Sequence, residues 1–272
     1  MRVGFIGLGG QGGPMARRIA EAGYELTLWA RRPASVDPFA DTGATVAASP
    51  AELGAASDLV CLCVVGDHDV DQVLDGDTGV LAGLAPGGIV VIHSTVHPNT
   101  CIDIAKKAAG KGISMIDAPV SGGGQAASDG TLLVMVGGDE DVLTRARPVF
   151  ETYAGAIVHL GPVGSGQVAK ILNNVLFSAS LGVATNTLEL GDSLGIPRDK
   201  LCDVLTRGSA NSTALATIRV LGGSLDGLAA TAGVLLQKDV RHAASLAESA
   251  SAPEGVVFAA ADTALSSMKH PR

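Results

Sequence analysis

The chain has 272 residues, 47% of them apolar and 17% charged, which suits a compact α/β protein rather than a disordered chain. A net charge of −8 and an aromatic content of 3% argue against a nucleic-acid-binding surface. The four cysteines lack metal-ligand or disulfide spacing, and Cys61 and Cys63 read as core residues of one strand face. No apolar run approaches the ~20 residues of a membrane span, and the sequence enters a strand at once without a signal peptide. We therefore expect a cytoplasmic protein with no metal site and no membrane contact.

The first part of the chain alternates short β-branched runs with helical patterns. Seven runs are predicted to be strands: 3–7, 25–29, 58–65, 88–94, 114–120, 132–136 and 156–160. Several are apolar throughout, as expected for strands covered on both faces. Helical patterns lie between them, for example at 14–22 and 99–109. This βαβα rhythm predicts a mostly parallel, doubly wound sheet.

The strand signal fades after Gly161. Residues 164–194 are rich in Ala, Leu, Val and Asn and contain no proline, so they predict one helix of about 45 Å. Further helices are expected at 198–207, 211–220, 229–249 and 256–268. The predicted fold is an α/β Rossmann-type N-terminal domain (1–162) and an all-α C-terminal domain (163–272), joined by the long helix.

The first strand runs directly into a glycine loop. Gly7, Gly9 and Gly12 form G-x-G-x-x-G between a predicted strand and a predicted helix, the context that confirms a dinucleotide fingerprint. Gly7 makes the tight turn, Gly9 lets a pyrophosphate approach, and the helix N-terminus supplies positive potential. The loop residues Leu8, Gly10 and Gln11, and Val64 and Val65 at the end of the third strand run, are assigned to the same cofactor site.

The residues after the second strand predict which cofactor binds. An NAD enzyme usually places Asp or Glu here to hold the ribose hydroxyl groups, but this chain has no acid between Trp29 and Asp37. Arg31 and Arg32 offer charged donors to a 2′-phosphate instead. We therefore expect NADP, with NAD possible.

A second glycine-rich stretch follows the run at 114–120. Ser121, Gly122 and Gly123 begin Ser-Gly-Gly-Gly, where backbone N–H groups beside a hydroxyl form a good seat for an anion such as a carboxylate. Further on, Lys170 and Asn174 stand four residues apart and so share one face of the long helix.

Five ordered motifs resemble the β-hydroxyacid dehydrogenases, the family of 3-hydroxyisobutyrate dehydrogenase and tartronate semialdehyde reductase within the 6-phosphogluconate dehydrogenase superfamily. They are GLGGQGGPMA, HSTVHPNT, DAPVSGGGQAASDGTLLVMVGG, GPVGSGQVAKILNN and QKDV, collinear over nearly the whole chain. Three features depart from the family pattern: Gln11 replaces a usual Met, His93 replaces a common acidic residue, and the sequence stops about thirty residues after Asp239.

The resemblance implies roles for individual residues. Ser121, Gly122 and Gly123 would bind the substrate carboxylate, and Lys170 would be the acid/base in hydride transfer, with Asn174 orienting substrate or lysine. Thr95 matches a position beside the nicotinamide, and Lys238 one that reaches the cofactor. Asp239 would either hold nearby structure or be a helix-surface charge. The resemblance also implies a homodimer or homotetramer built through the C-terminal domain.

The predicted function is NADP-dependent interconversion of a small β-hydroxyacid and its semialdehyde or ketoacid. One alternative is an imine reductase, a group that shares this architecture but commonly replaces the lysine with Asp or Tyr. Another is a non-catalytic, cofactor-binding regulatory protein. Lys170 and the Ser-Gly-Gly seat argue against the imine reductase, and Lys170 and Asn174 argue against the regulatory protein. His93, His97 and His159 are interpreted as structural residues.

Overall fold

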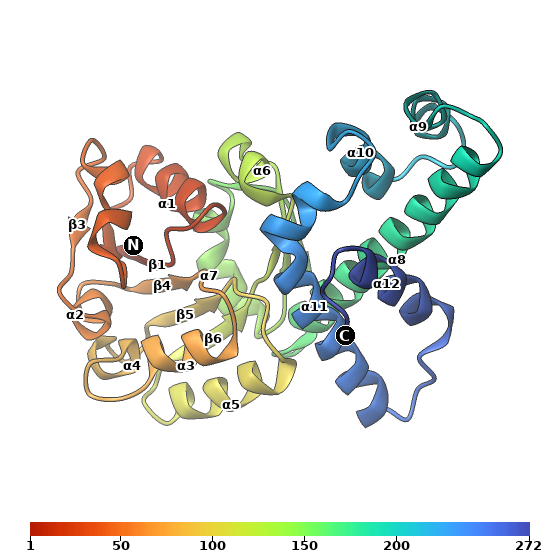
Figure 1. Cartoon of the computed structure of the whole chain (residues 1–272). Coiled ribbons are helices and arrows are strands. Elements are labelled where there is room, and N and C mark those ends of the chain that lie inside the picture. Colours follow the sequence, from red (N-terminus) through yellow and green to blue (C-terminus); the bar gives the residue numbers. More distant parts are fainter. The chain divides into compact units, whose positions relative to one another are not determined.

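The computed structural model describes residues 1–272 as two compact units, Met1–Lys170 and Ile171–Arg272 (Figure 1). The main sheet of the first unit has six parallel strands in the order β3-β2-β1-β4-β5-β6. They are β1 (Val3–Ile6), β2 (Leu26–Trp29), β3 (Thr45–Val46), β4 (Leu59–Leu62), β5 (Ile89–Ile92) and β6 (Ser114–Asp117). The chain order reverses at β1, which lies between β2 and β4. This parallel, doubly wound sheet confirms the predicted Rossmann-type fold, and dinucleotides bind at such a reversal point.

Helices cover both faces of this sheet because its strands are apolar on both sides. One face packs against α1 (Gly12–Glu21), α6 (Gly123–Asp129) and α7 (Glu140–Phe150) through a core that includes Phe5, Met15 and Ile19. The other face packs against α2 (Pro50–Ala55), α3 (Asp67–Leu74), α4 (Val80–Gly83) and α5 (Pro98–Ala109). The loop after β2 carries two short 3₁₀ helices, η1 (Pro33–Ser35) and η2 (Asp37–Phe39).

The run at 114–120 was predicted as one strand, and here the prediction is wrong. It breaks at Ala118 and Pro119 into β6 and a two-residue strand, β7 (Val120–Ser121). β7 belongs to a separate three-stranded sheet with β8 (Leu132–Val136) and β9 (Ala154–His159). Proline lacks the N–H group that a continuing strand would donate, so the chain leaves the main sheet at this point.

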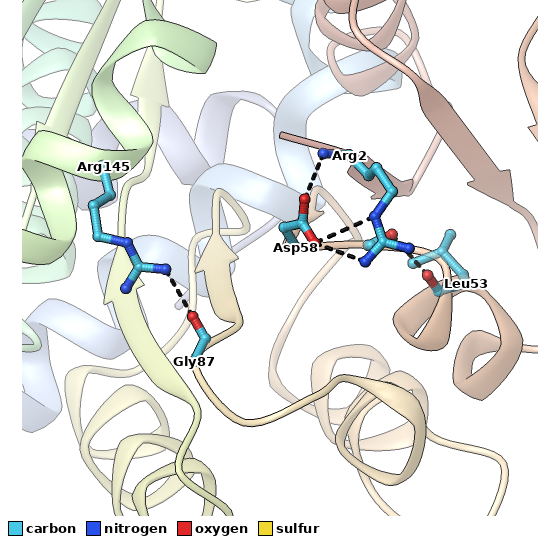
Figure 2. A network of polar contacts seen from close by, with 6 residues as sticks. Arg2, Leu53, Asp58, Gly87 and Arg145 are labelled. Carbon is cyan, nitrogen blue, oxygen red and sulfur yellow. Dashed lines mark hydrogen bonds and ion pairs between the residues drawn. The ribbon is translucent and has the colours of Figure 1, made fainter.

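Polar contacts hold the end of the main sheet where the parallel strands begin. The backbone N–H of Arg2 donates to Asp58 Oδ2 at 2.8 Å, and its Nη2 lies 2.7 Å from Asp58 Oδ1 (Figure 2). Arg145 Nη2 donates to the Gly87 carbonyl at 2.7 Å in the loop before β5. These bonds fix the starts of β1, β4 and β5, and the glycine loop lies at the opposite edge.

The second unit is all helical. The long helix α8 (Ser165–Ser193) enters it and is followed by α9 (Arg198–Arg207), α10 (Thr213–Val220), α11 (Asp226–Ser249) and α12 (Gly255–Ser267). These bounds lie within three residues of the predicted helices. Ile171, Leu181 and Leu188 of α8 are fully buried among the later helices.

Helix α8 was not predicted to resemble a membrane span, yet its length and composition would allow it to cross one. An 18-residue stretch of α8 has a mean hydropathy of 1.3, and 39% of this stretch is buried inside the protein. Its buried stripe packs in the helical core of the second unit, so α8 serves as the core helix of a soluble protein.

Candidate active site

The glycine loop after β1 is closed against the protein on one side and open on the other. Gly7 has φ +102°, and a Cβ there would lie 2.2 Å from the Cys63 carbonyl oxygen. A Cβ on Gly12 would lie 2.0 Å from the Gly7 carbonyl oxygen. A Cβ on Gly9 or Gly10 would have no other atom within 4 Å. Only glycine fits the packed positions, and the open ones leave room for phosphate oxygens at the start of α1. The loop therefore fits a dinucleotide pyrophosphate.

A pocket of about 420 Å³ adjoins this loop within the first unit. It is lined by Ile6, Gly7, Leu8, Gly9, Trp29, Ala30, Arg31, Arg32, Ser35, Cys63, Val64, Val65, Asp69 and Val73. The pocket thus brings together seven of the predicted cofactor residues: Gly7, Leu8, Gly9, Arg31, Arg32, Val64 and Val65. Gly10, Gln11, Gly12, Thr95 and Lys238 do not line it. Its size and its mix of apolar walls with a few charged groups suit a cofactor site.

The pocket also contains an acid that the sequence search missed. Asp69, in the first turn of α3, forms an ion pair with Arg31, whose Nη2 also lies 3.4 Å from Gln72 Oε1. The Arg31 side chain is 63% exposed and that of Asp69 21%. Asp69 reaches the pocket from α3, the helix that follows β4, and not from the residues after β2, where an NAD enzyme usually carries its acid.

The predicted carboxylate seat lies beside the glycine loop. Ser121 ends β7, Gly122 and Gly123 have φ values of +131° and +73°, and α6 begins at Gly123. A Cβ on Gly124 would lie 2.3 Å from the Gly10 carbonyl oxygen, so the two loops are in direct backbone contact. Gly122 and Gly123 are exposed to solvent. The fold therefore places two stretches with anion-binding composition next to each other, although more than 100 residues separate them.

Thr95 and Lys170 both belong to the first unit, and both are half-buried. Thr95 follows β5, in a loop where Ser94 Oγ accepts a 2.8 Å hydrogen bond from the Val64 N–H. Lys170 is in the second turn of α8.

The remaining predicted residues are in the second unit. Asn174 Nδ2 donates to Asp239 Oδ2 at 2.6 Å, and Lys238 Nζ lies 3.0 Å from Asp239 Oδ1. Asp239 is only 3% exposed, so it is not a helix-surface charge. It joins the other two polar residues into one group.

Two buried titratable groups lie close to the carboxyl edge of the main sheet. Burial raises the pKa of Asp117 to about 6, and hydrogen bonds from backbone N–H groups partly offset this shift. Burial lowers the pKa of His93 to about 4, while a hydrogen bond with the Ala118 carbonyl acts in the opposite direction. His93 also contacts Tyr153, with 3.1 Å between Nε2 and the hydroxyl oxygen.

The other predicted structural residues also have structural partners. His97 Nδ1 accepts from the Asn99 N–H at 3.2 Å at the start of α5, and His159 Nε2 lies 2.8 Å from the Gly138 carbonyl. All four cysteines are free, and burial raises the pKa of Cys61, Cys63, Cys101 and Cys202. No group of three or more His, Cys, Asp or Glu is arranged to hold a metal ion.

Comparison with known protein families agrees with this geometry in both units. Residues 2–161 match the NAD-binding domain of 6-phosphogluconate dehydrogenase, and residues 164–270 match the NAD-binding domain of NADP-dependent 3-hydroxyisobutyrate dehydrogenase. The chain belongs to the β-hydroxyacid dehydrogenase family. This family consists of NAD(P)-dependent oxidoreductases that act on CH–OH groups and is part of the 6-phosphogluconate dehydrogenase superfamily.

Individual relatives act on different hydroxyacids. The chain is 37% identical over 214 residues to the NAD-dependent L-serine dehydrogenase of Pseudomonas aeruginosa, covering 79% of this chain and 72% of that one. It is 36% identical over 213 residues to a 3-hydroxyisobutyrate dehydrogenase of the same organism, covering 78% and 72%. Two uncharacterised Mycobacterium tuberculosis oxidoreductases align over 66% of their length.

Solved structures show the same fold. A Mycobacterium tuberculosis 3-hydroxyisobutyrate dehydrogenase with L-serine matches with a TM-score of 0.85 and 30% identity, covering 100% of this chain and 96% of that one. A Streptomyces aurantiacus imine reductase has a TM-score of 0.71 at 20% identity and covers 99% and 98%. At that identity the second match shows a shared fold alone.

Proposed function

We propose that this chain catalyses the reversible, NADP-dependent oxidation of a small β-hydroxyacid to its semialdehyde or ketoacid. The observation that carries the proposal is the backbone contact between Gly10 and Gly124, which brings the proposed carboxylate seat next to the glycine loop. A substrate held by its carboxylate at Ser121–Gly123 would have its hydroxyl carbon a short distance along the same edge. Serine and 3-hydroxyisobutyrate, the substrates named for the relatives, both fit this requirement. The preference for NADP is supported by Arg31 and Arg32 in the pocket.

The proposed mechanism assigns one task to each polar residue. When bound, the nicotinamide supplies or accepts the hydride. The Lys170 ammonium donates a proton to the carbonyl oxygen in the reductive direction, and its neutral amine removes the hydroxyl proton in the oxidative direction. Ser121 and the N–H groups of Gly122 and Gly123 hold the carboxylate, while Asn174, Thr95 and Lys238 orient substrate, lysine or cofactor.

The test is a substrate panel followed by paired variants. Purified protein is assayed with L-serine, 3-hydroxyisobutyrate, L-threonate and a cyclic imine, each with NADP(H) and NAD(H), by absorbance of the reduced cofactor. On the best hydroxyacid, Lys170→Ala should lose about 10²–10⁴-fold in kcat. Lys170→Arg should fail to restore activity, because a guanidinium keeps its proton. Lys111→Ala, at an exposed lysine in the loop before β6, is the matched control.

Each outcome of this test separates one function from the others. Turnover of the imine alone would favour the imine reductase alternative. Tight cofactor binding without turnover of any panel member would favour the regulatory alternative. Near-native turnover by Lys170→Ala would refute the lysine mechanism.

We also propose a homodimer or homotetramer built through the second unit, and a cytoplasmic location. Apolar side chains of α8 remain exposed, among them Leu176 at 62% and Val183 at 59%. They border a groove of about 490 Å³ that Val256 of α12, 87% exposed, also lines. Exposed apolar surface of this kind is typical of subunit interfaces. A monomer in sedimentation at micromolar concentration would contradict the oligomer.

A further inference from the structure

The first turn of α8 is held by a carboxylate from a distant strand. Asp117, at the end of β6, is fully buried, and its Oδ1 accepts from the Gly164 N–H at 2.7 Å. Its Oδ2 accepts from the Gln167 N–H at 2.8 Å. Helix α8 has no acidic residue in its own first turn, so Asp117 supplies the negative charge that favours a helix N-terminus. The start of α8 is thereby fixed to the carboxyl edge of the main sheet.

The same turn also holds the loop after β5. Gln167 is fully buried, and its Oε1 accepts from the Val96 N–H at 3.1 Å while its Nε2 donates to the Ser94 carbonyl at 2.9 Å. One side-chain amide thus binds the backbone immediately before and immediately after Thr95. The oxygen and the nitrogen of the amide therefore both have hydrogen-bond partners, and Ser94 and Val96 are buried.

We propose that Gln167 is a positioning residue that fixes the backbone around Thr95 to the helical turn carrying Lys170. The proposal rests on the proposed function, in which Thr95 lies beside the nicotinamide and Lys170 exchanges the proton. Lys170 follows Gln167 by three residues, a rise of about 4.5 Å along the helix. The only intervening structure is hydrogen-bonded helix, so the clamp sets the distance from the lysine to the Thr95 loop.

Such a clamp affects turnover more than binding. Reacting groups must be held near their reactive geometry, and a displacement of about 1 Å can cost 10²-fold in rate. The pocket that would hold the adenosine half of the cofactor is lined by neither Ser94, Val96 nor Gln167. Loss of the clamp should therefore lower kcat and leave cofactor affinity nearly unchanged.

The test replaces Gln167 with Met, which keeps the length and removes both hydrogen bonds. Gln167→Asn is the second variant, because it keeps the amide but is one methylene too short. The matched control is Ser57→Ala, which removes another buried hydrogen bond of the same unit, from Ser57 Oγ to the Leu53 carbonyl at 2.7 Å. The readouts are kcat, KM, NADPH binding by fluorescence, melting temperature, and hydrogen–deuterium exchange of the cofactor-free protein.

We expect both Gln167 variants to lower kcat by about 10- to 100-fold, with KM and NADPH affinity within about threefold of wild type. In both Gln167 variants, hydrogen–deuterium exchange should accelerate in the peptide spanning 93–97 and at the start of α8. In Ser57→Ala, exchange in these two segments should stay at the wild-type rate. Near-native kcat, or exchange in 93–97 equal to that of the control, would overturn the proposal while leaving the proposed function intact. The proposed function is tested separately, by turnover of the substrate panel with the wild-type protein and by the loss of turnover in Lys170→Ala.

Discussion

Asp239 lies on α11 with one carboxylate oxygen 2.6 Å from Asn174 Nδ2 and the other 3.0 Å from Lys238 Nζ. This buried carboxylate accepts one short, charge-assisted hydrogen bond from a neutral amide and forms an ion pair with an ammonium group. It fixes the orientation of the Asn174 amide, whose oxygen accepts from Asn173 Nδ2 at 3.0 Å. Two of the proposed site residues are therefore held by a third residue that was not assigned to the site.

The first prediction concerns this carboxylate. Asp239→Asn should lower kcat by about 10-fold or more and reduce the free energy of unfolding by about 1–3 kcal/mol, because an NH₂ group would face one of the two donors. Asp199→Asn, at an exposed ion pair with Lys200, is the control and should change neither quantity measurably. Turnover and thermal melts of the two variants provide the measurement. Equal kcat and equal melting of the two variants would show that Asp239 does not position Asn174 or Lys238.

The second prediction concerns cofactor choice. Arg31→Ala should raise the KM for NADP much more than that for NAD, at a cost of about 1.5–3 kcal/mol for a lost charge-assisted contact. Asp69→Asn should act in the opposite direction and improve NADP over NAD by up to about fivefold, because it frees Arg31 from an exposed ion pair and removes a negative charge from the pocket. KM values for both cofactors in both variants provide the check, and parallel changes for NADP and NAD would refute the assignment.

The third prediction compares two adjacent glycines. Gly124→Ala would place a Cβ 2.3 Å from the Gly10 carbonyl, so the two loops must separate and the KM values for cofactor and substrate should both rise. At Gly123 there is space for a Cβ but φ is +73°, so alanine there costs about 1–2 kcal/mol of backbone strain. Its effect should fall mainly on substrate KM. Steady-state kinetics with each ligand varied in turn distinguishes the two patterns.

The fourth prediction concerns pH. His93 has a folded pKa of about 4, below that of an unfolded histidine, so the unfolded state binds more protons as the pH falls from about 6.5 to 4 and stability decreases. Asp117, with a folded pKa of about 6, acts oppositely, because the folded state gains its proton first as the pH falls from about 6 to 4. The two effects oppose each other over this range.

Removing His93 should therefore reveal the effect of Asp117. His93→Phe, which keeps an aromatic ring among Phe5, Phe150 and Tyr153, should lose less stability than wild type between pH 7 and pH 4.5. The difference should be on the order of 2 kcal/mol. Urea unfolding at the two pH values measures it. An identical pH dependence in both proteins would mean that His93 titrates normally.

Most of the fold could be predicted because its signals are local. Apolar runs identified the main strands, and the helices of the second unit were placed within a few residues. The two-residue β3 was missed because Thr45 and Val46 carry no periodicity. β7 was merged with β6 because only Asp117 interrupts the apolar residues from Met115 to Val120.

The candidate site likewise contains parts with a local sequence signal and parts without one. The glycine loop was recognisable because its conformational requirement lies within six residues. Asp69, Asp117 and Gln167 could not be found, since their partners lie 38, 47 to 50 and 71 to 73 residues away. Only the closed sheet brings these residues together, and no spacing in the sequence records the contact.

The buried cysteines have a practical consequence. Cys61, Cys101 and Cys202 are at most 3% exposed, and burial raises the pKa of the half-buried Cys63 to about 12. Thiolate is the reactive form, so the native protein should be almost inert to maleimides and alkylating dyes. A single cysteine introduced at an exposed position such as Ser128 would then be the sole labelling site. A fluorescent reporter there could follow the proposed carboxylate seat as ligands bind, without removing any native thiol.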